Sequence, residues 1–446
     1  MIIRDPVHGD VEFTEAESSI LDTSELQRLR GIKQLGTSYL VYPGALHTRF
    51  DHSVGTMWVS KKIISSLRSR GHDVSEEQEL QVTVLSLIHD VAHVPFGHTF
   101  EDERKILPSH DKGDRIKVLL DDGELGDALN DLGLKKAIPH LLLADEPLER
   151  NLELPWPVQI VKDSISADLL DYLRRDSYFT GLEQNYDDRV FRYFTLVDHT
   201  VGSKTKQVLA VDLGKEGMVR QDARSEVLHL LRMRYFLTER VYYHHAKQSS
   251  GAMVSKALEL CIEAGLDPSA LTWMNDWTLL EELKSHPTGK KLVSGLEKRR
   301  LYKRAFVLGS EIGPSKRNQL IARYNLPGLG REDMENRIID GLGRGGSDVG
   351  AGDVIIHCPD LGTMKEAKVF AVDEEGVVDK LHMHRRPISR DLDHIENQYL
   401  AIWNFFIFTR RDIVRKAYEV ARGLFPGETP NFRLKDYGEL PGPPGQ

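Results

Sequence analysis

The chain has 446 residues, which is long enough for two domains or for one large domain with an extensive core. Its hydrophobic content of 40% and charged content of 28% are typical of a soluble globular protein, and its net charge of −9 argues against general affinity for nucleic acid or anionic membranes. Two cysteines in unrelated contexts exclude a disulfide framework or a cysteine-ligated zinc site. Because the sequence shows neither a membrane-length apolar run nor a signal-peptide pattern, we expect a cytoplasmic protein.

Helical patterns dominate the first half of the chain. Ser75 followed by Gln78 forms a capping-box signature, and the helix that it opens is predicted to run to His93, just before Pro95. The apolar residues of this helix recur at helical spacing and predict one buried face. Other helices are predicted over 25–36, 54–71, 157–179 and 225–248.

The second half of the chain changes character. Helical patterning continues over 256–266 and 278–286, and the glycine-rich stretch 340–353 then predicts a mobile loop. Short strands are predicted over 354–359 and 367–378, followed by a helix over 394–423 and a disordered proline-glycine tail. We therefore predict a mainly α fold with two parts, an N-terminal domain over 1–260 and a smaller α+β C-terminal lobe over 261–446.

The stretch LIHDVAHVPFGH, residues 87–98, places His89, Asp90, His93 and His98 among aliphatic residues. A single histidine in such a setting is more often a packed core residue than a ligand. On a helix, the adjacent side chains of His89 and Asp90 diverge by about 100°, so both can hold one ion only if the ion lies between their faces. Imidazole and carboxylate groups suit Fe, Mn, Ni or Zn, and further ligands must come from elsewhere in the chain.

Two distant segments offer such ligands. Upstream, HTRFDHSVGT carries Arg49 and His52 just before a predicted helix. Downstream, SISADLLDYLRRD places Asp168 and Tyr172 along one face of a predicted helix. Carboxylates in an otherwise apolar helix are costly to bury unless they are paired or bound to metal.

The order His52, His89-Asp90, Asp168 resembles the H…HD…D signature of the HD superfamily of metal-dependent phosphohydrolases. The segments DPVHGDVEF, LQRLRGIKQLG, YPGALHTRFDHSVG, HDVAHVPFGHTFE, SADLLDYLRRDSYFTG and RYFLTERVYYHHAKQ are similar to the deoxynucleoside triphosphate (dNTP) triphosphohydrolases of that superfamily. The resemblance covers about residues 3–250 and implies that residues 1–260 form a helical HD-domain core with phosphohydrolase activity.

The resemblance implies that a divalent ion (Mn, Fe, Ni, Zn or Mg) is held by His52, His89, Asp90 and Asp168. Attack at the α-phosphate of a dNTP would release the deoxynucleoside and intact triphosphate. The catalytic group implied beside this ion comprises His93, His98, Glu101, His110 and Asp111. Within it, His98 or His110 would be the general acid, and Glu101 and Asp111 would orient the imidazoles.

Contacts to the nucleotide are implied by the same resemblance. The residues that match phosphate-binding positions are Arg49, His93, His98 and Arg234. The residues that match sugar-reading positions are Gln34, Tyr172, Asp176 and Tyr242. The ring of Tyr242 near the ribose 2′-carbon would leave no room for a 2′-hydroxyl, which predicts a preference for deoxynucleotides.

One position departs from the family's pattern. The family's animal enzyme has a lysine directly after the metal-binding aspartate, whereas this chain has Leu169. Loss of that cation predicts weaker binding of triphosphate, so nucleoside mono- or diphosphates remain alternative substrates.

The resemblance also implies regulation at a subunit interface. Asp22, Gln27 and Arg30 match residues that bind a guanine nucleotide there, which predicts activation by GTP or dGTP and a homo-oligomer, either a dimer or a tetramer. The alternative is that this helix is simply an amphipathic interface helix.

The motif allows two other interpretations. HDxxH is close to the HExxH of zinc peptidases, but that site needs the middle carboxylate as a base and a helix through both histidines, which Pro95 opposes. The other interpretation is a nucleotide-sensing scaffold without turnover. All four ligand types are retained, which argues against that interpretation.

Overall fold

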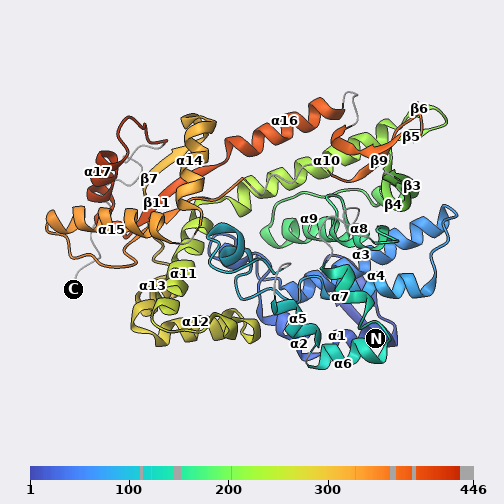
Figure 1. Cartoon of the computed structure of the whole chain (residues 1–446), viewed down its shortest axis with the longest axis horizontal. Coiled ribbons are helices and arrows are strands. Elements are labelled where there is room, and N and C mark those ends of the chain that lie inside the picture. Colours follow the sequence, from blue (N-terminus) through green and yellow to red (C-terminus); the bar gives the residue numbers. More distant parts are fainter. Residues whose placement is uncertain are drawn as a thin grey trace.

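The structure is a computed structural model that describes residues 1–110, 114–121, 123–143, 152–201, 203–326, 328–361, 368–383 and 388–431. Helices dominate these residues and the strands form small sheets, which confirms the predicted mainly α fold (Figure 1). Residues 432–446 of the predicted tail lie outside the described part of the chain.

The first half of the chain forms a hairpin followed by helices. Its strands and α-helices are β1 (Ile2–Asp5), β2 (Gly9–Glu12), α1 (Glu15–Leu21), α2 (Ser24–Arg28), α3 (Arg49–Ser69), α4 (Glu76–Ile88), α5 (Asp114–Asp121), α6 (Glu124–Asp131), α7 (Ala137–Leu142), α8 (Trp156–Lys162) and α9 (Ala167–Thr180). Short 3₁₀-helices form η1 (Leu29–Gly31) and η2 (Gly36–Leu40), and a π-helical turn forms η3 (Thr99–Glu103).

The second half alternates helices with short strands. Its strands and α-helices are β3 (Phe194–Val201), β4 (Lys204–Asp212), β5 (Gly214–Lys215), β6 (Met218–Val219), α10 (Gln221–Leu237), α11 (His245–Glu263), α12 (Asp276–Ser285), α13 (Pro287–Glu297), β7 (Lys303–Gly309), α14 (Pro314–Tyr324), α15 (Leu329–Arg344), β8 (Val354–His357), β9 (Phe370–Val372), β10 (Val378–Lys380), α16 (Ile388–Ala401), β11 (Asn404–Thr409) and α17 (Val414–Leu424). Short helical turns form η4 (Asp188–Tyr193), η5 (Thr238–Tyr242), η6 (Pro268–Trp273), η7 (Ser310–Ile312), η8 (Leu381–Met383) and η9 (Arg411–Ile413). Every helix in the described part of the chain is too short or too polar to cross a bilayer.

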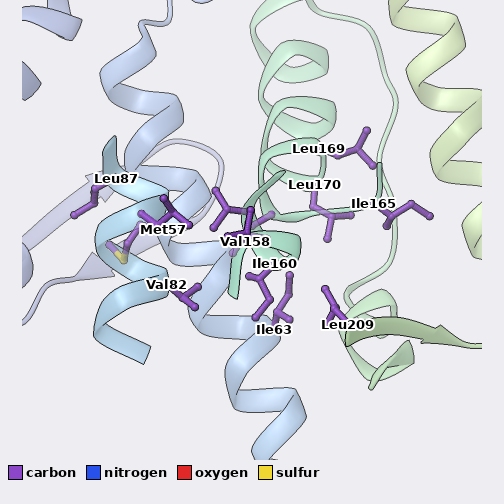
Figure 2. Packing of buried hydrophobic residues seen from close by; sticks show 14 of the residues in the cluster. Met57, Ile63, Val82, Leu87, Val158, Ile160, Ile165, Leu169, Leu170 and Leu209 are labelled. Carbon is purple, nitrogen blue, oxygen red and sulfur yellow. The ribbon is translucent and has the colours of Figure 1, made fainter. Parts of the chain in front are cut away.

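The main core lies between α3, α4, α8 and α9. Figure 2 shows buried apolar side chains from these helices packed against one another, among them Met57, Val82, Val158 and Leu170. Burial of each such side chain contributes about 1.5–3 kcal/mol of hydrophobic stabilisation. This packing holds the start of α3, the end of α4 and the start of α9 at one place, where the predicted metal ligands lie.

The helix predicted to run to His93 ends earlier than expected. The capping box that starts α4 is confirmed, since Ser75 accepts from the Gln78 N–H, but α4 ends at Ile88 and His89 is its C-cap. Beyond Ile88 the chain continues in tighter turns, in which the Val91 N–H donates to the Ile88 carbonyl and the His93 N–H to the Asp90 carbonyl. The Arg28 guanidinium donates to the carbonyl oxygens of Val91 (2.7 Å) and His93 (2.9 Å) and so holds these turns. His93 therefore lies in a loop, not on the same helical face as His89.

The helix predicted from residue 54 begins earlier, at Arg49. Thr48 caps it, because its side chain accepts from the Asp51 N–H while the Asp51 carboxylate accepts from the Thr48 N–H. Arg49 and His52 therefore lie in the first turn of α3, not in the preceding loop.

Three long predicted helices are interrupted. The 25–36 segment is split into α2 and η1, the 157–179 segment into α8 and α9, and the 225–248 segment into α10, η5 and α11. In the second of these, Ser166 restarts the helix by accepting from the Leu169 N–H. This break places Asp168 in a first helical turn, where a carboxylate is favoured by the helix dipole.

The helix predicted over 394–423 is interrupted in its middle, although residues 394–401 belong to α16 and residues 414–423 to α17. Residues 404–409, NFFIFT, form β11, the central strand of the sheet β7-β11-β8, flanked by α16 and α17. Aromatic and β-branched residues favour a strand when neighbouring strands can pair with them on both sides. The strands predicted over 354–359 and 367–378 are confirmed as β8 and as the hairpin β9-β10, whereas residues 340–344 of the predicted loop belong to α15.

A second sheet joins segments that lie far apart in sequence. Its order is β10-β9-β4-β3, with β4 and β9 parallel and Ala210 opposite Phe370. Helix α16 then runs along α10 toward the β7-β11-β8 sheet (Figure 1). The division of the chain at about residue 260 stays a prediction.

His357 in β8 makes folding stability sensitive to acid. Its side chain is 0% exposed, and burial together with the positive charge of Arg104 holds the pKa of His357 well below its usual value. Below pH about 6.5 the unfolded chain takes up a proton that the folded protein does not, so stability falls as the pH falls. We expect His357→Leu to reduce that slope by up to about 1.4 kcal/mol per pH unit between pH 6.5 and 5, measured by urea unfolding at several pH values. An unchanged slope would contradict the burial of a neutral imidazole.

Candidate active site

The four predicted metal ligands come from three helix ends that the core brings together. His52 lies in the first turn of α3, His89 caps the C-terminus of α4 with Asp90 next to it, and Asp168 lies in the first turn of α9. His52, His89 and Asp90 are buried, whereas the Asp168 side chain is one third exposed. The group is therefore open on the Asp168 side.

The donor atoms of this group lie at the separations that one ion requires. The Nε2 atom of His52 is 3.0 Å from Asp168 Oδ1 and 3.3 Å from His89 Nε2. Asp90 Oδ2 lies 4.0 Å from His52 Nε2, and Asp90 Oδ1 lies 3.6 Å from His89 Nε2. His52, His89 and Asp168 offer donor atoms that all lie within 4.8 Å of one another, which suits one shared ion. Asp90 borders this group with a different oxygen toward each histidine.

The imidazoles of His52 and His89 are each oriented by a hydrogen bond at Nδ1. The His89 Nδ1 lies 2.7 Å from the Ser86 carbonyl oxygen, and the His52 Nδ1 lies 2.7 Å from Asp171 Oδ2. An Nδ1–H bonded in this way leaves a lone pair on Nε2, which is the form a metal needs. The chemistry of the donor set thus agrees with its geometry.

Asp171 is itself held by three groups. Arg175 donates to both of its oxygens (2.8 and 2.9 Å), and His8 Nε2 lies 2.6 Å from Asp171 Oδ1. Asp5 in β1 accepts from the other side of Arg175 at 2.8 Å. The sequence analysis assigned no role to His8 or Asp5, although the segment DPVHG that carries them belongs to the family resemblance.

The electrostatics of the group favour a positive charge. Burial alone would lower the pKa of His52, but the carboxylates of Asp168 and Asp171 raise it to about 10. Burial would raise the pKa of Asp90, but His89 and Arg49 hold it well below its usual range. A site that attracts a proton this strongly between carboxylates also attracts a divalent cation.

A second group of histidines lies beside the first. The His93 and His110 rings stack with centroids 3.5 Å apart, and His110 Nδ1 lies 2.9 Å from Glu101 Oε2. His98 completes the group, and its Nδ1 lies 2.6 Å from Asp102 Oδ2. Glu101 therefore contacts His110, and His98 contacts Asp102, which had no predicted role. Asp111 lies outside the described residues.

This second group also gathers donor atoms of the kind that bind metals. His93, His98, Glu101 and His110 offer donor atoms within 4.8 Å of one another, which is close enough for a metal. Burial, Arg49 and His110 nevertheless hold the pKa of His93 well below its usual value. Burial is the largest cause of this shift, and burial lowers the pKa of His89 in the first group as well.

Two arginines predicted to bind phosphate lie near the metal ligands. Arg49 is 1% exposed and donates to Asp90 at 2.5 Å. Arg234 in α10 is buried beside Tyr172 and Tyr399, whose hydroxyl groups act with Asp168 to raise its pKa although burial opposes this. Tyr399 in α16 was not predicted, because nothing near it in sequence marks it.

The residues predicted to read the sugar converge on Asp176. Tyr242 donates to Asp176 Oδ2 at 2.6 Å, and His47 Nε2 lies 2.8 Å from Asp176 Oδ1. The backbone N–H of Gln34 donates to the His47 carbonyl at 3.0 Å, and Gln34 Oε1 is buried with no hydrogen-bond partner among the described residues. Tyr172 lies one turn before Asp176 on α9. The structure thus places these predicted residues together and adds His47.

The three residues predicted to bind an effector lie together near the N-terminus. Gln27 donates to the Leu21 carbonyl and accepts from Arg30 Nε, both at 2.8 Å. Asp22 is the exposed C-cap of α1, next to Leu21. The Arg30 guanidinium carbon lies 3.5 Å from the centre of the Phe50 ring, which follows Arg49 in α3.

Leu169 is part of the core. It is 3% exposed and belongs to the apolar cluster in Figure 2. The position after Asp168 therefore presents an aliphatic side chain to its neighbours, and the cation of the animal enzyme has no counterpart there.

Two family models match the chain. The HD domain matches residues 49–127, which carry His52, His89 and Asp90. The HD-associated region matches residues 222–429, which carry Arg234, Tyr242 and Tyr399.

Similar proteins include named enzymes and uncharacterised ones. An uncharacterised protein of Methanocaldococcus jannaschii is 28% identical over 94% of this chain and 81% of its own length. The deoxynucleoside triphosphate triphosphohydrolase SAMHD1 of Bos taurus is 27% identical over 68% of this chain, and that of Danio rerio is 30% identical over 46%. This chain spans 58% and 37% of those two enzymes.

Two solved structures share the fold. A hypothetical protein from Aquifex aeolicus has a TM-score of 0.67 at 22% identity, covering 94% of this chain and 99% of its own. A phosphohydrolase from Bacteroides thetaiotaomicron has a TM-score of 0.66 at 22% identity, covering 92% and 99%.

Proposed function

This chain belongs to the HD superfamily of metal-dependent phosphohydrolases, and we propose that it hydrolyses dNTPs to a deoxynucleoside and triphosphate. The observation that carries the proposal is the cluster of His52, His89 and Asp168 donor atoms, with Asp90 beside it and a second group of histidines next to Asp90. The named triphosphohydrolases among its relatives support dNTPs as the substrates.

His52, His89, Asp90 and Asp168 would hold the divalent ion, which when bound supplies Lewis-acid stabilisation of the charge developing on the phosphate. The forked guanidinium groups of Arg49 and Arg234 would bind and orient the polyphosphate. Water adds to the α-phosphorus and the bond to the 5′-oxygen breaks.

The leaving 5′-oxygen needs a proton. We assign this step to the His98 and His110 pair, because a carboxylate lies within hydrogen-bonding distance of the Nδ1 atom of each ring and can orient it. The side chain of His98 is 52% exposed, so it can meet an entering nucleotide, whereas that of His110 is 12% exposed.

The test is an activity screen on purified protein of known metal content. Four dNTPs, four NTPs and the matching mono- and diphosphates are assayed with Mn²⁺ or Mg²⁺, and products are separated by ion chromatography. We expect deoxynucleoside and triphosphate in equal amounts from dNTPs. Release of inorganic phosphate, or turnover of monophosphates or diphosphates only, would overturn the proposal in favour of the shorter substrates that Leu169 allows. No turnover would favour a sensing scaffold.

Tyr242 is expected to set the preference for deoxyribose. We expect Tyr242→Ala to lower the ratio of kcat/KM for dATP over ATP by about 10-fold or more, because the space beside the 2′-carbon opens. Tyr242→Phe is the matched control, since it keeps the ring and removes only the hydrogen bond to Asp176. Equal ratios in the alanine variant and the wild type would rule out steric discrimination by this ring.

Regulation by a guanine nucleotide is part of the same proposal. Its support is the proximity of Asp22, Gln27 and Arg30 on one surface. We expect GTP or dGTP to raise dATP turnover and to favour a larger oligomer, both measured at matched protein concentration. Hyperbolic dATP kinetics that do not change on addition of either nucleotide would overturn this part.

A further inference from the structure

The loop that carries the catalytic histidines has a strained backbone. Phe96 has a φ of 58° and Gly97 a φ of 42°, both in the left-handed region. A phenylalanine rarely adopts this conformation, because its Cβ approaches its own carbonyl oxygen. The turn lies between His93 and His98, whose ring centroids are 4.8 Å apart, so its conformation decides how these rings face each other. Strain of this kind persists only where surrounding contacts hold it.

The first such contact is the carboxylate of Asp276, at the start of α12. This residue is 0% exposed, and its Oδ1 accepts from the Phe96 N–H at 3.0 Å. Its Oδ2 accepts from the Lys33 N–H at 3.0 Å, with Lys33 Nζ at 3.4 Å. One buried carboxylate therefore ties the strained turn to the segment that carries Gln34.

The second contact lies at the other end of the loop, just after η3. Arg104 is 1% exposed, and its guanidinium donates to Glu259 Oε2 at 2.8 Å and to the Ile356 carbonyl. Arg331 donates to the Arg104 carbonyl at 3.2 Å and also to Glu259. The main chain after Glu101 and Asp102 is thus fixed by charged groups that are themselves buried.

Every one of these contacts comes from outside the HD domain. That domain matches residues 49–127, whereas Asp276, Glu259, Arg331 and Ile356 belong to the HD-associated region. We propose that the HD-associated region positions the catalytic histidines, with Asp276 holding the Phe96 turn and the Glu259–Arg331 pair holding Arg104. The effect on kcat that this inference predicts rests on the proposed function. A displacement of about 1 Å in a catalytic group can cost about 100-fold in rate.

The test replaces Asp276 by asparagine, whose amide offers one oxygen acceptor for two backbone N–H groups. We expect the exchange of backbone hydrogens in peptides spanning residues 93–104 to accelerate at least about tenfold, measured by mass spectrometry without substrate. We expect kcat to fall by about 10- to 100-fold with KM nearly unchanged. Metal content stays at the wild-type value, because Asp276 contacts none of the four ligands in the described structure. Arg331→Met is expected to accelerate exchange mainly at the Arg104 end.

The matched control is Asp353→Asn. Asp353 is also buried, accepting from the Gly350 N–H at 3.0 Å and from Lys291 at 2.6 Å. If the two asparagine variants show the same loop exchange and the same kcat, Asp276 is merely structural and the inference is overturned. If the wild type hydrolyses no nucleotide, the proposed function fails, and the exchange measurement alone decides whether Asp276 holds the loop.

Discussion

Asp90→Ala is expected to abolish both metal binding and hydrolysis. Its oxygens lie 3.6 Å from His89 Nε2 and 4.0 Å from His52 Nε2, so the variant removes one ligand from the site. Loss of the ion removes several kcal/mol of transition-state stabilisation, which corresponds to at least about a 10³-fold fall in kcat. Metal content by mass spectrometry and product release by ion chromatography measure the two effects.

Two further variants make this result interpretable. Asp90→Ala leaves Arg49 buried without its carboxylate, which costs about 3–5 kcal/mol, so Asp90→Asn is used as well because it keeps an oxygen for that arginine. Glu282→Ala is the control, because it also removes a carboxylate that lies beside a histidine, here 3.2 Å from His286 at the surface. This variant should retain full metal content and full activity. Full metal content in both Asp90 variants would exclude Asp90 as a ligand. If the wild type shows no turnover and neither Asp90 variant changes the metal content, a sensing scaffold is favoured.

Gly55→Ala is expected to be the most damaging small substitution in the chain. A Cβ at Gly55 would lie 1.9 Å from Asp171 Oδ1 and 2.2 Å from Arg175 Nη2. Both partners are fully buried and neither can move without breaking the ion pair that orients His52. We expect the free energy of unfolding to fall by about 3–5 kcal/mol and the metal affinity to fall by about 10- to 100-fold. Urea denaturation and metal titration measure these changes.

Gly343→Ala is the matched control for this substitution. Gly343 also lies in a helix, α15, but nothing lies within 4 Å of the position its Cβ would take. Replacing a helical glycine by alanine without a clash should stabilise the protein by about 0.5–1 kcal/mol. If Gly55→Ala is as stable as Gly343→Ala, the Asp171–Arg175 pair does not pack against α3 as described.

Local sequence signals predicted the start of α4 correctly but not its end. The Ser75–Gln78 capping box is complete within four residues, so sequence alone suffices to locate it. The turns that follow α4 are held by Arg28, which lies about 60 residues away in sequence and donates to the Val91 and His93 carbonyl oxygens. The β11 segment fits a helix and a strand equally well until β7 and β8 pair with it. In both cases a distant partner decides between two locally acceptable conformations.

The candidate site shows the same division. The predicted ligands could be placed because their order along the chain matches a family signature, and the structure brings all four together. The groups behind the site, such as His8 against Asp171 and Asp276 against the Phe96 turn, are common residue types with no local pattern, and only the tertiary fold brings them there. Predicting such residues requires knowing which surfaces meet, which composition and periodicity do not reveal.

The parallel pairing of β4 with β9 has a consequence for how the protein is made. Residue 210 leaves the ribosome long before residue 370, its partner, has been synthesised. At ordinary rates of translation that interval is on the order of ten seconds, during which one edge of β4 has no strand beside it. An unpaired edge of this kind can pair with another chain. Nascent copies on one messenger are therefore exposed to mispairing at β4, and a chaperone that shields this edge would raise the yield of native protein.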